Sequence, residues 1–275
     1  MPLAAPLPVI LLTLAIASPL TACNPAPSSN NTPPPLLLAA SSTTDAIDAL
    51  LSDLLTEPLA VSHAGSNTLS TQVLAGVAAG RGGVLLIADP RWADVVADAG
   101  WAADRVALLA NSLVLITPAN PEAHGFQPWA TPPTTSDPRP LALAGEAVPA
   151  GRYADQALQH PTQRSDPALT PLHNRRVIRG QHARSVLAYV ASGEAAAGVV
   201  YATDARATDA VRIAHRFPPH THDPITYTLV LLRPAPHQPP TPQSQQLFNT
   251  LQSPAALDRF TALGFRPLPQ SEPAP

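Results

Sequence analysis

The sequence contains no lysine and only one cysteine. Both shortages limit the classes of protein to which the chain can belong. All 16 basic residues are arginines, set against 19 acidic residues, for a formal net charge of −3. A nucleic-acid-binding protein needs a basic face to neutralise phosphates, and this chain has no excess of basic residues. We attribute the missing lysine, together with the abundant alanine and proline, to genomic composition bias. A lone cysteine also leaves no disulfide within the chain.

Strong enzyme motifs are also missing. The sequence has no G-x-S-x-G, no P-loop and no G-x-G-x-x-G after a strand-like run. Nine histidines are scattered along the chain, and two of them form the pair His220 and His222. Prolines on both sides of this pair favour an exposed loop over a metal site. The sequence therefore predicts a protein that is not an enzyme and holds no metal or cofactor.

The N-terminal segment has the features of an export signal. Residues 9–20 are apolar, but this run is too short to cross a bilayer as a helix. It ends in Leu-Thr-Ala-Cys, which resembles the lipobox of bacterial lipoproteins, where the cysteine is lipidated and becomes the mature N-terminus. We predict a signal peptide with lipobox at 1–23, a membrane lipid anchor on Cys23, and a flexible Pro/Ser/Asn tether at 24–35. The alternative is an incidental cysteine near an ordinary cleavage site.

The rest of the chain alternates strand-like and helix-like segments. Apolar runs predict strands at 36–40, 59–62, 84–88, 113–117, 198–201 and 225–232. Helices are predicted at 45–55, 65–79, 91–99, 153–159, 183–192 and 248–263, the last broken at 253–254. This alternation predicts an α/β fold with mostly parallel sheets. In such sheets a ligand binds beyond the carboxyl ends of the strands, near the N-termini of the following helices.

Several of the predicted helices begin with small or hydroxyl-bearing residues. A helix N-terminus has unpaired N–H groups and roughly half a positive charge. Several such ends that converge in a cleft form an anion site without lysine or arginine. A site made only of donors also discriminates against an oxyanion that still carries an acidic proton. Taken singly, each of these turns is explained as well by an ordinary helix cap.

Seven short segments, in order along residues 37–267, are similar to those of one known family. Residues 39–46 (AASSTTDA) resemble A-A-S-L-T-x-A, and residues 64–69 (AGSNTL) resemble A-S-S-S-T-L. Residues 148–154 (VPAGRYA) match V-P-A-G-x-Y-A. The remaining similarities are at 87–92, 111–115, 183–205 (with V-R followed by G-I-V-Y-x-S/T-D-A) and 264–267. Together these segments resemble the molybdate-binding proteins of ABC importers.

The resemblance implies a fold and a set of ligands. The fold is the two-lobed, type II-like periplasmic-binding-protein fold, with two mostly parallel sheets flanked by helices and a ligand cleft between the lobes. Lobe one would be residues 36–112 and 229–275, and lobe two residues 113–228. In the family, two serine hydroxyls, two backbone amides and a tyrosine hydroxyl bind the oxyanion. The matching positions here are Ser42, Ser66, Ala150, Ala183 and Tyr201.

The resemblance also implies a function. It is that of an exported, periplasmic or cell-surface monomer that captures molybdate or tungstate and delivers it to an ABC transporter permease. Two alternatives stay open. The protein could bind another oxyanion, such as sulfate or phosphate, or it could be a degenerate surface lipoprotein that binds none.

Overall fold

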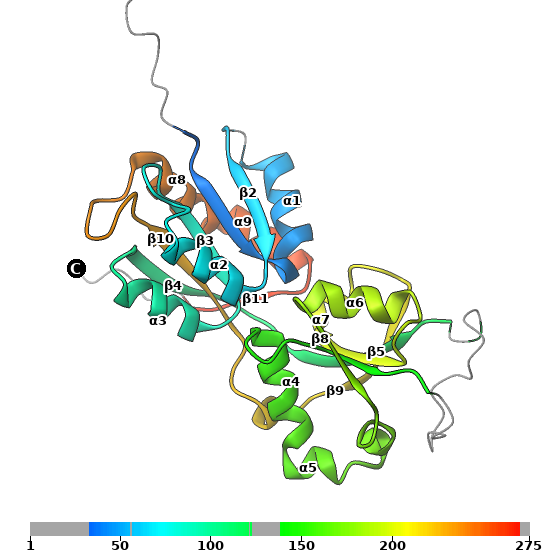
Figure 1. Ribbon diagram of the computed structural model, residues 1–275. Coiled ribbons are helices and arrows are strands. Elements are labelled where there is room, and N and C mark those ends of the chain that lie inside the picture. The colour runs from blue at the N-terminus through cyan, green and yellow to red at the C-terminus, as the bar shows by residue number, and fades with distance from the viewer. Residues whose placement is uncertain (1–32, 56, 121, 123–137, 270–275) are drawn as a thin grey trace, which may run out of the picture. The chain divides into compact units, whose positions relative to one another are not determined.

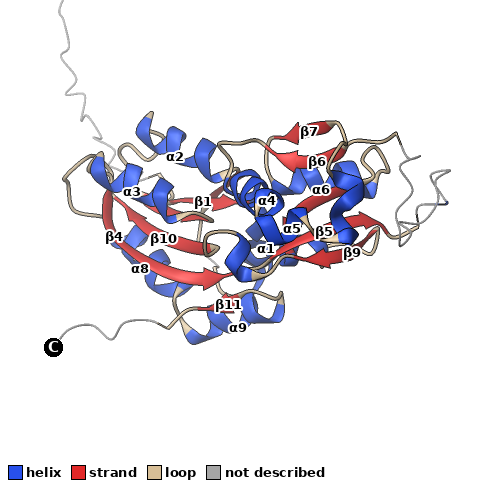
Figure 2. Ribbon diagram, turned by 90° about the horizontal axis from the view of Figure 1, so that it is seen from below, coloured by secondary structure: helices blue, strands red, loops and turns tan. Residues whose placement is uncertain are grey.

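The computed structural model describes residues 33–55, 57–120, 122 and 138–269 (Figure 1). The predicted signal peptide, Cys23 and most of the predicted tether lie outside the described residues. Two β-sheets organise the described chain, and we call the parts built on them lobe one and lobe two. Helices lie against the strands of both sheets (Figure 2).

Lobe one is built on a six-stranded sheet in the order β11-β4-β10-β3-β1-β2. Its strands are β1 (Leu36–Ala40), β2 (Ala60–Ala64), β3 (Gly83–Ile87), β4 (Ala102–Ala110), β10 (Thr226–Leu232) and β11 (Arg266–Pro267). Its helices are α1 (Thr44–Asp53), α2 (Ser66–Leu74), α3 (Pro90–Asp98), α8 (Pro242–Leu251) and α9 (Pro254–Ala262). A 3₁₀ turn at Ser41–Thr43 joins β1 to α1.

Lobe two is built on a five-stranded sheet in the order β7-β6-β8-β5-β9. Its strands are β5 (Leu113–Pro118), β6 (Leu141–Ala144), β7 (Val177–Gly180), β8 (Ala197–Tyr201) and β9 (Val211–Arg216). Its helices are α4 (Pro149–Gln159), α5 (Pro161–Arg164), α6 (Ala183–Ala191) and α7 (Ala202–Ala205). Short 3₁₀ turns occupy Pro167–Leu172 and Pro219–Thr221.

The central strands are buried on both faces, which explains their uninterrupted apolar sequences. In β1, Leu37 and Ala39 belong to the hydrophobic cluster that includes α1, α8 and α9. Leu36 and Leu38 belong to a second cluster, with α2 and α3. All five residues of β1 are buried. The alternation of side chains along the strand thus serves two helical layers at once.

The two-lobed α/β fold is confirmed, but the sheets are mixed rather than mostly parallel. β1 is parallel to β2 and β3, and β6 is parallel to β7 and β8. The pairings made by β5, β10 and β11 are antiparallel. β5 and β10 are the first strands that the chain forms after passing from one lobe to the other. Each therefore starts at the sheet edge where the parallel strands end, and runs against them.

The passages between the lobes are short. The chain leaves lobe one after Ala110 and begins β5 at Leu113, and it leaves lobe two after Arg216 and begins β10 at Thr226. The predicted boundary at 112/113 falls in the first passage. The boundary at 228/229, which the family resemblance implies, falls inside β10.

Candidate ligand-binding site

A small pocket lies where the parallel strands of the two sheets end, three strands in each lobe. β1, β2 and β3 approach it from lobe one, and β6, β7 and β8 from lobe two. The empty space between its lining atoms is about 210 Å³, a figure that includes open solvent, and the centre of a water-sized sphere has only about 10 Å³ in which to move. That is room for roughly one small group the size of a water molecule. The pocket suits a small ion. Its lining residues are Ala40, Ser41, Ser42, Ala64, Gly65, Ser66, Ala88, Val148, Pro149, Ala150, His182, Ala183 and Tyr201.

All five residues predicted to bind a ligand line this pocket. Ser42 and Ser66 come from lobe one, and Ala150, Ala183 and Tyr201 come from lobe two. They are spread over 160 positions of the sequence, and only the fold brings them together. Their placement agrees with the expectation that ligands bind beyond the carboxyl ends of the strands. Their role as oxyanion ligands stays a prediction.

Both serines are buried and oriented by neighbours. Ser66 is the first residue of α2, and its Oγ accepts a hydrogen bond from the backbone N–H of Ala88 at 3.1 Å. This leaves the Ser66 hydroxyl proton available for another acceptor. Ser42 lies in the 3₁₀ turn after β1, with its Oγ 2.7 Å from the hydroxyl of Tyr227. The amide of Asn111 donates to the same Tyr227 hydroxyl at 3.4 Å.

Both residues predicted to act through their backbone N–H groups lie at helix N-termini. Ala150 is the second residue of α4 and Ala183 is the first residue of α6. The first four N–H groups of a helix have no partner within it, and they lie at the positive end of its dipole. The ring of His182 caps α6, its Nδ1 accepting the N–H of Ser185 at 3.2 Å. Burial, and then the charge of Arg184, lowers the pKa of His182, so the ring is neutral near pH 7.

Tyr201 carries the most informative atom of the pocket. Its side chain is 2% exposed, and its hydroxyl has no hydrogen-bond partner among the described residues. Burial, followed by the nearby Tyr227, raises the pKa of Tyr201 well above its usual value, so the hydroxyl stays protonated. An unsatisfied buried donor costs about 1–3 kcal/mol, and such groups are rare in native proteins. The hydroxyl is therefore poised to donate to a ligand.

The pocket contains no charged side chain among the described residues that line it. Arg184, next to Ala183, is instead paired with two acids: its Nε lies 2.8 Å from Asp204 and its other end pairs with Asp45 of lobe one. Burial raises the pKa of Asp204 to about 6, against the lowering effect of Arg184. The arginine charge is thus met by carboxylates outside the pocket, and the pocket itself offers neutral donors.

A comparison with protein families matches residues 36–266 to the bacterial extracellular solute-binding proteins. This match covers almost all of the described chain. The chain belongs to that family.

Individual members of the family resemble this solute-binding protein closely enough to be compared. The molybdate-binding protein ModA of Escherichia coli is 32% identical over 211 residues, covering 74% of this chain and 76% of ModA. YvgL of Bacillus subtilis, whose name describes a substrate-binding lipoprotein of an ABC transporter, is 31% identical over 163 residues. That match covers 59% of this chain and 58% of YvgL. The chain thus spans little more than half the length of YvgL.

A solved structure shows the same fold. The periplasmic molybdate-binding protein of Azotobacter vinelandii superposes with a TM-score of 0.65 at 19% identity. The superposition covers 86% of the solute-binding protein and 100% of the Azotobacter chain. At this level of identity the likeness concerns the fold alone.

Tyr227, which is next to the pocket, and His182, which lines it, were not among the predicted site residues. Tyr227 lies in β10 between two threonines and before an aliphatic run. A buried aromatic residue with a polar end is the signal that could have drawn attention to it. His182 precedes Ala183 and could have been recognised as the residue before a predicted helix. Neither signal by itself indicates a ligand.

The histidines His220 and His222 each lie next to another ring of the protein. The His220 ring is exposed and lies 5.5 Å from the ring of His160, whereas His222 lies 6.0 Å from the ring of Tyr153. Within the described ranges, no three His, Cys, Asp or Glu side chains are grouped as a metal site would require. In the same ranges, no helix has the length and apolarity needed to cross a membrane.

Proposed function

We propose that this solute-binding protein captures molybdate, or the closely similar tungstate, for an ABC importer. The observation that carries the proposal is the buried, unpartnered hydroxyl of Tyr201 in a pocket lined by serine hydroxyls and helix N-termini. A tetrahedral oxyanion supplies acceptor oxygens on every side. It would satisfy Tyr201 and give the free hydroxyl proton of Ser66 a partner.

The neutral donors explain how a dianion can be held and released. Hydrogen bonds to a charged acceptor are each worth about 1.5–3 kcal/mol, so five of them can hold the ion without a formal positive charge. The N-termini of α4 and α6 add two dipoles that favour negative charge. A fully deprotonated oxyanion accepts from all these donors, whereas an acidic O–H in the ion would face a donor and stay unpaired.

The choice of molybdate rests on similarity rather than on the pocket. ModA of Escherichia coli, at 32% identity over three quarters of both chains, is named for this ligand. Molybdate and tungstate nearly coincide in size and shape, so both belong to the proposal. Sulfate and phosphate are the competing ligands that an experiment must separate.

Export, anchoring and partners belong to the same proposal. The apolar run ending in Leu-Thr-Ala-Cys supports a signal peptide and a lipid anchor on Cys23, as does the lipoprotein name of YvgL. The dianion would bind Ser42 and Ser66 in an open form, and lobe two would then close over it. The closed monomer would dock on the permease. No nucleophile–base pair is recognisable in the sequence, and we infer that the protein performs no catalysis.

A thermal-shift experiment tests the ligand. The purified protein is heated with molybdate, tungstate, sulfate or phosphate, with chloride as the control. A ligand present at 100 times its dissociation constant stabilises the folded state by about 2.7 kcal/mol, which raises the melting temperature visibly. We expect shifts with molybdate and tungstate only. A shift with sulfate or phosphate alone would change the ligand, and no shift with any oxyanion would favour a degenerate surface lipoprotein.

A further inference from the structure

The corner between β3 and α3 connects the pocket to the lobe interface. The Ala88 N–H donates to Ser66, which lines the pocket. The next residue, Asp89, is fully buried, and its carboxylate caps α3 by accepting the N–H of Arg91 at 3.0 Å. The Arg91 side chain also pairs with Asp89, at 3.0 Å. All of these contacts are made within lobe one.

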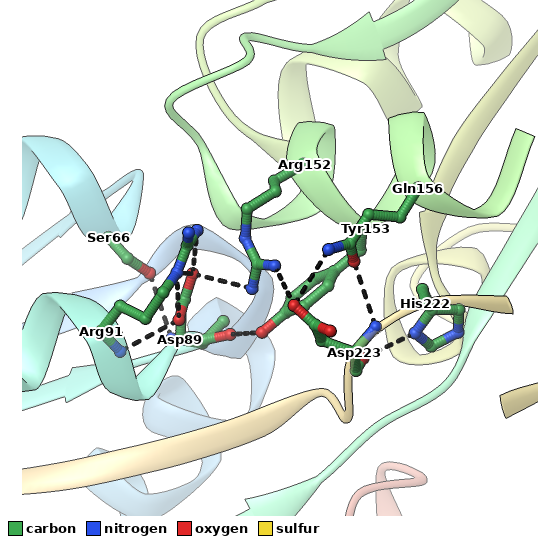
Figure 3. Close-up of polar contacts among 9 residues, drawn as sticks. Ser66, Asp89, Arg91, Arg152, Tyr153, Gln156, His222 and Asp223 are labelled. Carbon is green, nitrogen blue, oxygen red and sulfur yellow. Dashed lines mark hydrogen bonds and ion pairs between the residues drawn. The ribbon is translucent and has the colours of Figure 1, made fainter. Parts of the chain in front are cut away.

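Helix α4 of lobe two reaches the same corner (Figure 3). The hydroxyl of Tyr153 donates to the carbonyl oxygen of Ala88 at 3.2 Å, and the guanidinium of Arg152 donates to the Asp89 carboxylate at 3.1 Å. Arg152 also lies over the Tyr153 ring, 4.4 Å from its centre. Two consecutive residues of α4 thus form hydrogen bonds with two consecutive residues of lobe one, Ala88 and Asp89.

The segment between the lobes orients Arg152. Asp223, which precedes β10, pairs with Arg152 and accepts the side-chain amide of Gln156 at 2.9 Å. The Asp223 N–H donates back to Gln156 at 3.1 Å. Hydrogen bonds from Gln156 and Arg152 lower the pKa of Asp223, so it is charged near neutral pH. Arg152 therefore keeps one carboxylate partner that does not belong to the corner.

The contacts can open without leaving a buried charge unpaired. If α4 moves away, Asp89 keeps both of its contacts with Arg91, and Arg152 keeps Asp223. The Tyr153 hydroxyl and the Ala88 carbonyl would turn to water. A buried ion pair usually resists separation because one partner is left unpaired in a low dielectric. Here both charges have a second partner, which suits a contact that forms and breaks.

The same contacts fix the pocket. Ala150 lies two residues before Arg152 on α4, and Ser66 is held by the amide of Ala88. We propose that Arg152 and Tyr153 form an interlobe latch that positions the Ala150 N–H opposite Ser66, so that closing the lobes and completing the anion site are one event. This inference rests on the proposed function for its ligand but not for the latch itself.

Three variants of the purified protein test the latch. Arg152→Gln and Tyr153→Phe each remove one interlobe contact, whereas Arg91→Gln removes a partner of the same carboxylate within lobe one. Molybdate affinity is measured by calorimetry and dissociation by stopped flow. We expect Arg152→Gln to weaken binding roughly tenfold or more, and Tyr153→Phe roughly 2- to 12-fold, mainly through faster dissociation. Arg91→Gln should stay within about twofold of the unsubstituted protein.

Small-angle scattering without any oxyanion gives a readout that is independent of the ligand. The ligand-free protein should exchange between open and closed forms, with molybdate favouring the closed one. Loss of the latch shifts this exchange toward the open form, so Arg152→Gln and Tyr153→Phe should have a larger radius of gyration than Arg91→Gln. If the unsubstituted protein binds no oxyanion, the proposed function fails while this comparison still decides the latch. Equal radii in all three variants, or an equal loss of affinity in Arg91→Gln, would overturn the inference.

Discussion

At the scale of single residues, the hydroxyl of Tyr201 is the most informative group of the pocket. It is buried and has no hydrogen-bond partner among the described residues, which costs folding free energy. Ser42 and Ser66 each have a hydrogen-bond partner in the protein, the hydroxyl of Tyr227 and the backbone N–H of Ala88. Tyr201 has none among the described residues. The ligand-free protein thus holds an unsatisfied donor whose cost a bound oxyanion would remove.

Replacing Tyr201 by phenylalanine should therefore separate binding from stability. We expect Tyr201→Phe to weaken molybdate binding by about 1.5–3 kcal/mol, the worth of a hydrogen bond to a charged group. The ligand-free protein should lose no stability, because the variant removes an unpaired buried hydroxyl. Calorimetric titration and urea unfolding measure the two quantities. Tyr189→Phe, outside the pocket, is the control, and unchanged affinity in Tyr201→Phe would refute the role assigned to the hydroxyl.

The site residues were predictable only through likeness to a family. Ser42 and Ser66 look like ordinary caps, and Ala150 and Ala183 would act through backbone N–H groups that any residue except proline provides. Nothing in their side chains identifies a ligand. Tyr227 was not predicted as a site residue because its partner Ser42 is 185 positions away in the sequence. A local sequence pattern cannot pair residues at that separation.

At the scale of elements, the first turn of α4 lies unusually close to the end of β6. A Cβ at Gly151 would lie 2.2 Å from the carbonyl oxygen of Gly145 and 2.4 Å from that of Ala144. Such distances are impossible for a real side chain. Glycine at 151 is thus what lets α4 approach β6 and place Ala150 at the pocket.

Gly151→Ala should accordingly destabilise the protein. Within a helix, alanine in place of glycine normally stabilises by up to about 1 kcal/mol, but here the overlap forces α4 away from β6, at a cost of about 1–3 kcal/mol or more. Urea unfolding should show a lower midpoint, and molybdate binding should weaken with it. The matched control is Gly145→Ala, whose Cβ would meet nothing closer than 3.5 Å. Equal midpoints for the two variants would contradict this account.

Most of the longer apolar strands were predicted, whereas strands that are short or that carry charged residues were missed. The apolar runs at 36–40, 84–88, 113–117 and 198–201 correspond to β1, β3, β5 and β8. β4 carries exposed charged residues in its first half, β7 is a largely exposed edge strand, and β6 has only four residues. Charged residues interrupt the apolar pattern of β4 and β7, and β6 is apolar but too short to be recognised without its neighbouring strands. The helix predicted at 65–79 ends earlier, at Leu74, before Gly76 with φ +88°.

At the scale of the whole molecule, alternation of strands and helices predicted the fold class but not strand direction. β5 and β10 run against their neighbours because the chain enters each lobe at the edge where the parallel strands end. No local pattern in either strand encodes that reversal. It follows from the path of the chain between lobes, which is a property of the complete fold.

The interlobe contacts predict a change in dimensions on binding. Arg184 of α6 pairs with Asp45 of α1, and Tyr153 of α4 bonds to Ala88, so the lobes in this structure touch on more than one side of the pocket. We expect molybdate to reduce the radius of gyration of the purified protein in solution scattering. Chloride at the same ionic strength is the control. A radius that does not change at saturating molybdate would argue against closure of the lobes.

Both ends of the described chain belong to lobe one, which contains β1 and β11, whereas lobe two is inserted between β4 and β10. If the N-terminus is anchored to a membrane, the tether joins lobe one directly, and lobe two is attached only through lobe one. A membrane partner that docks on lobe one would then detect a bound solute through the displacement of lobe two. The order of strands along the chain would therefore make the position of lobe two the indicator of whether the pocket holds a solute.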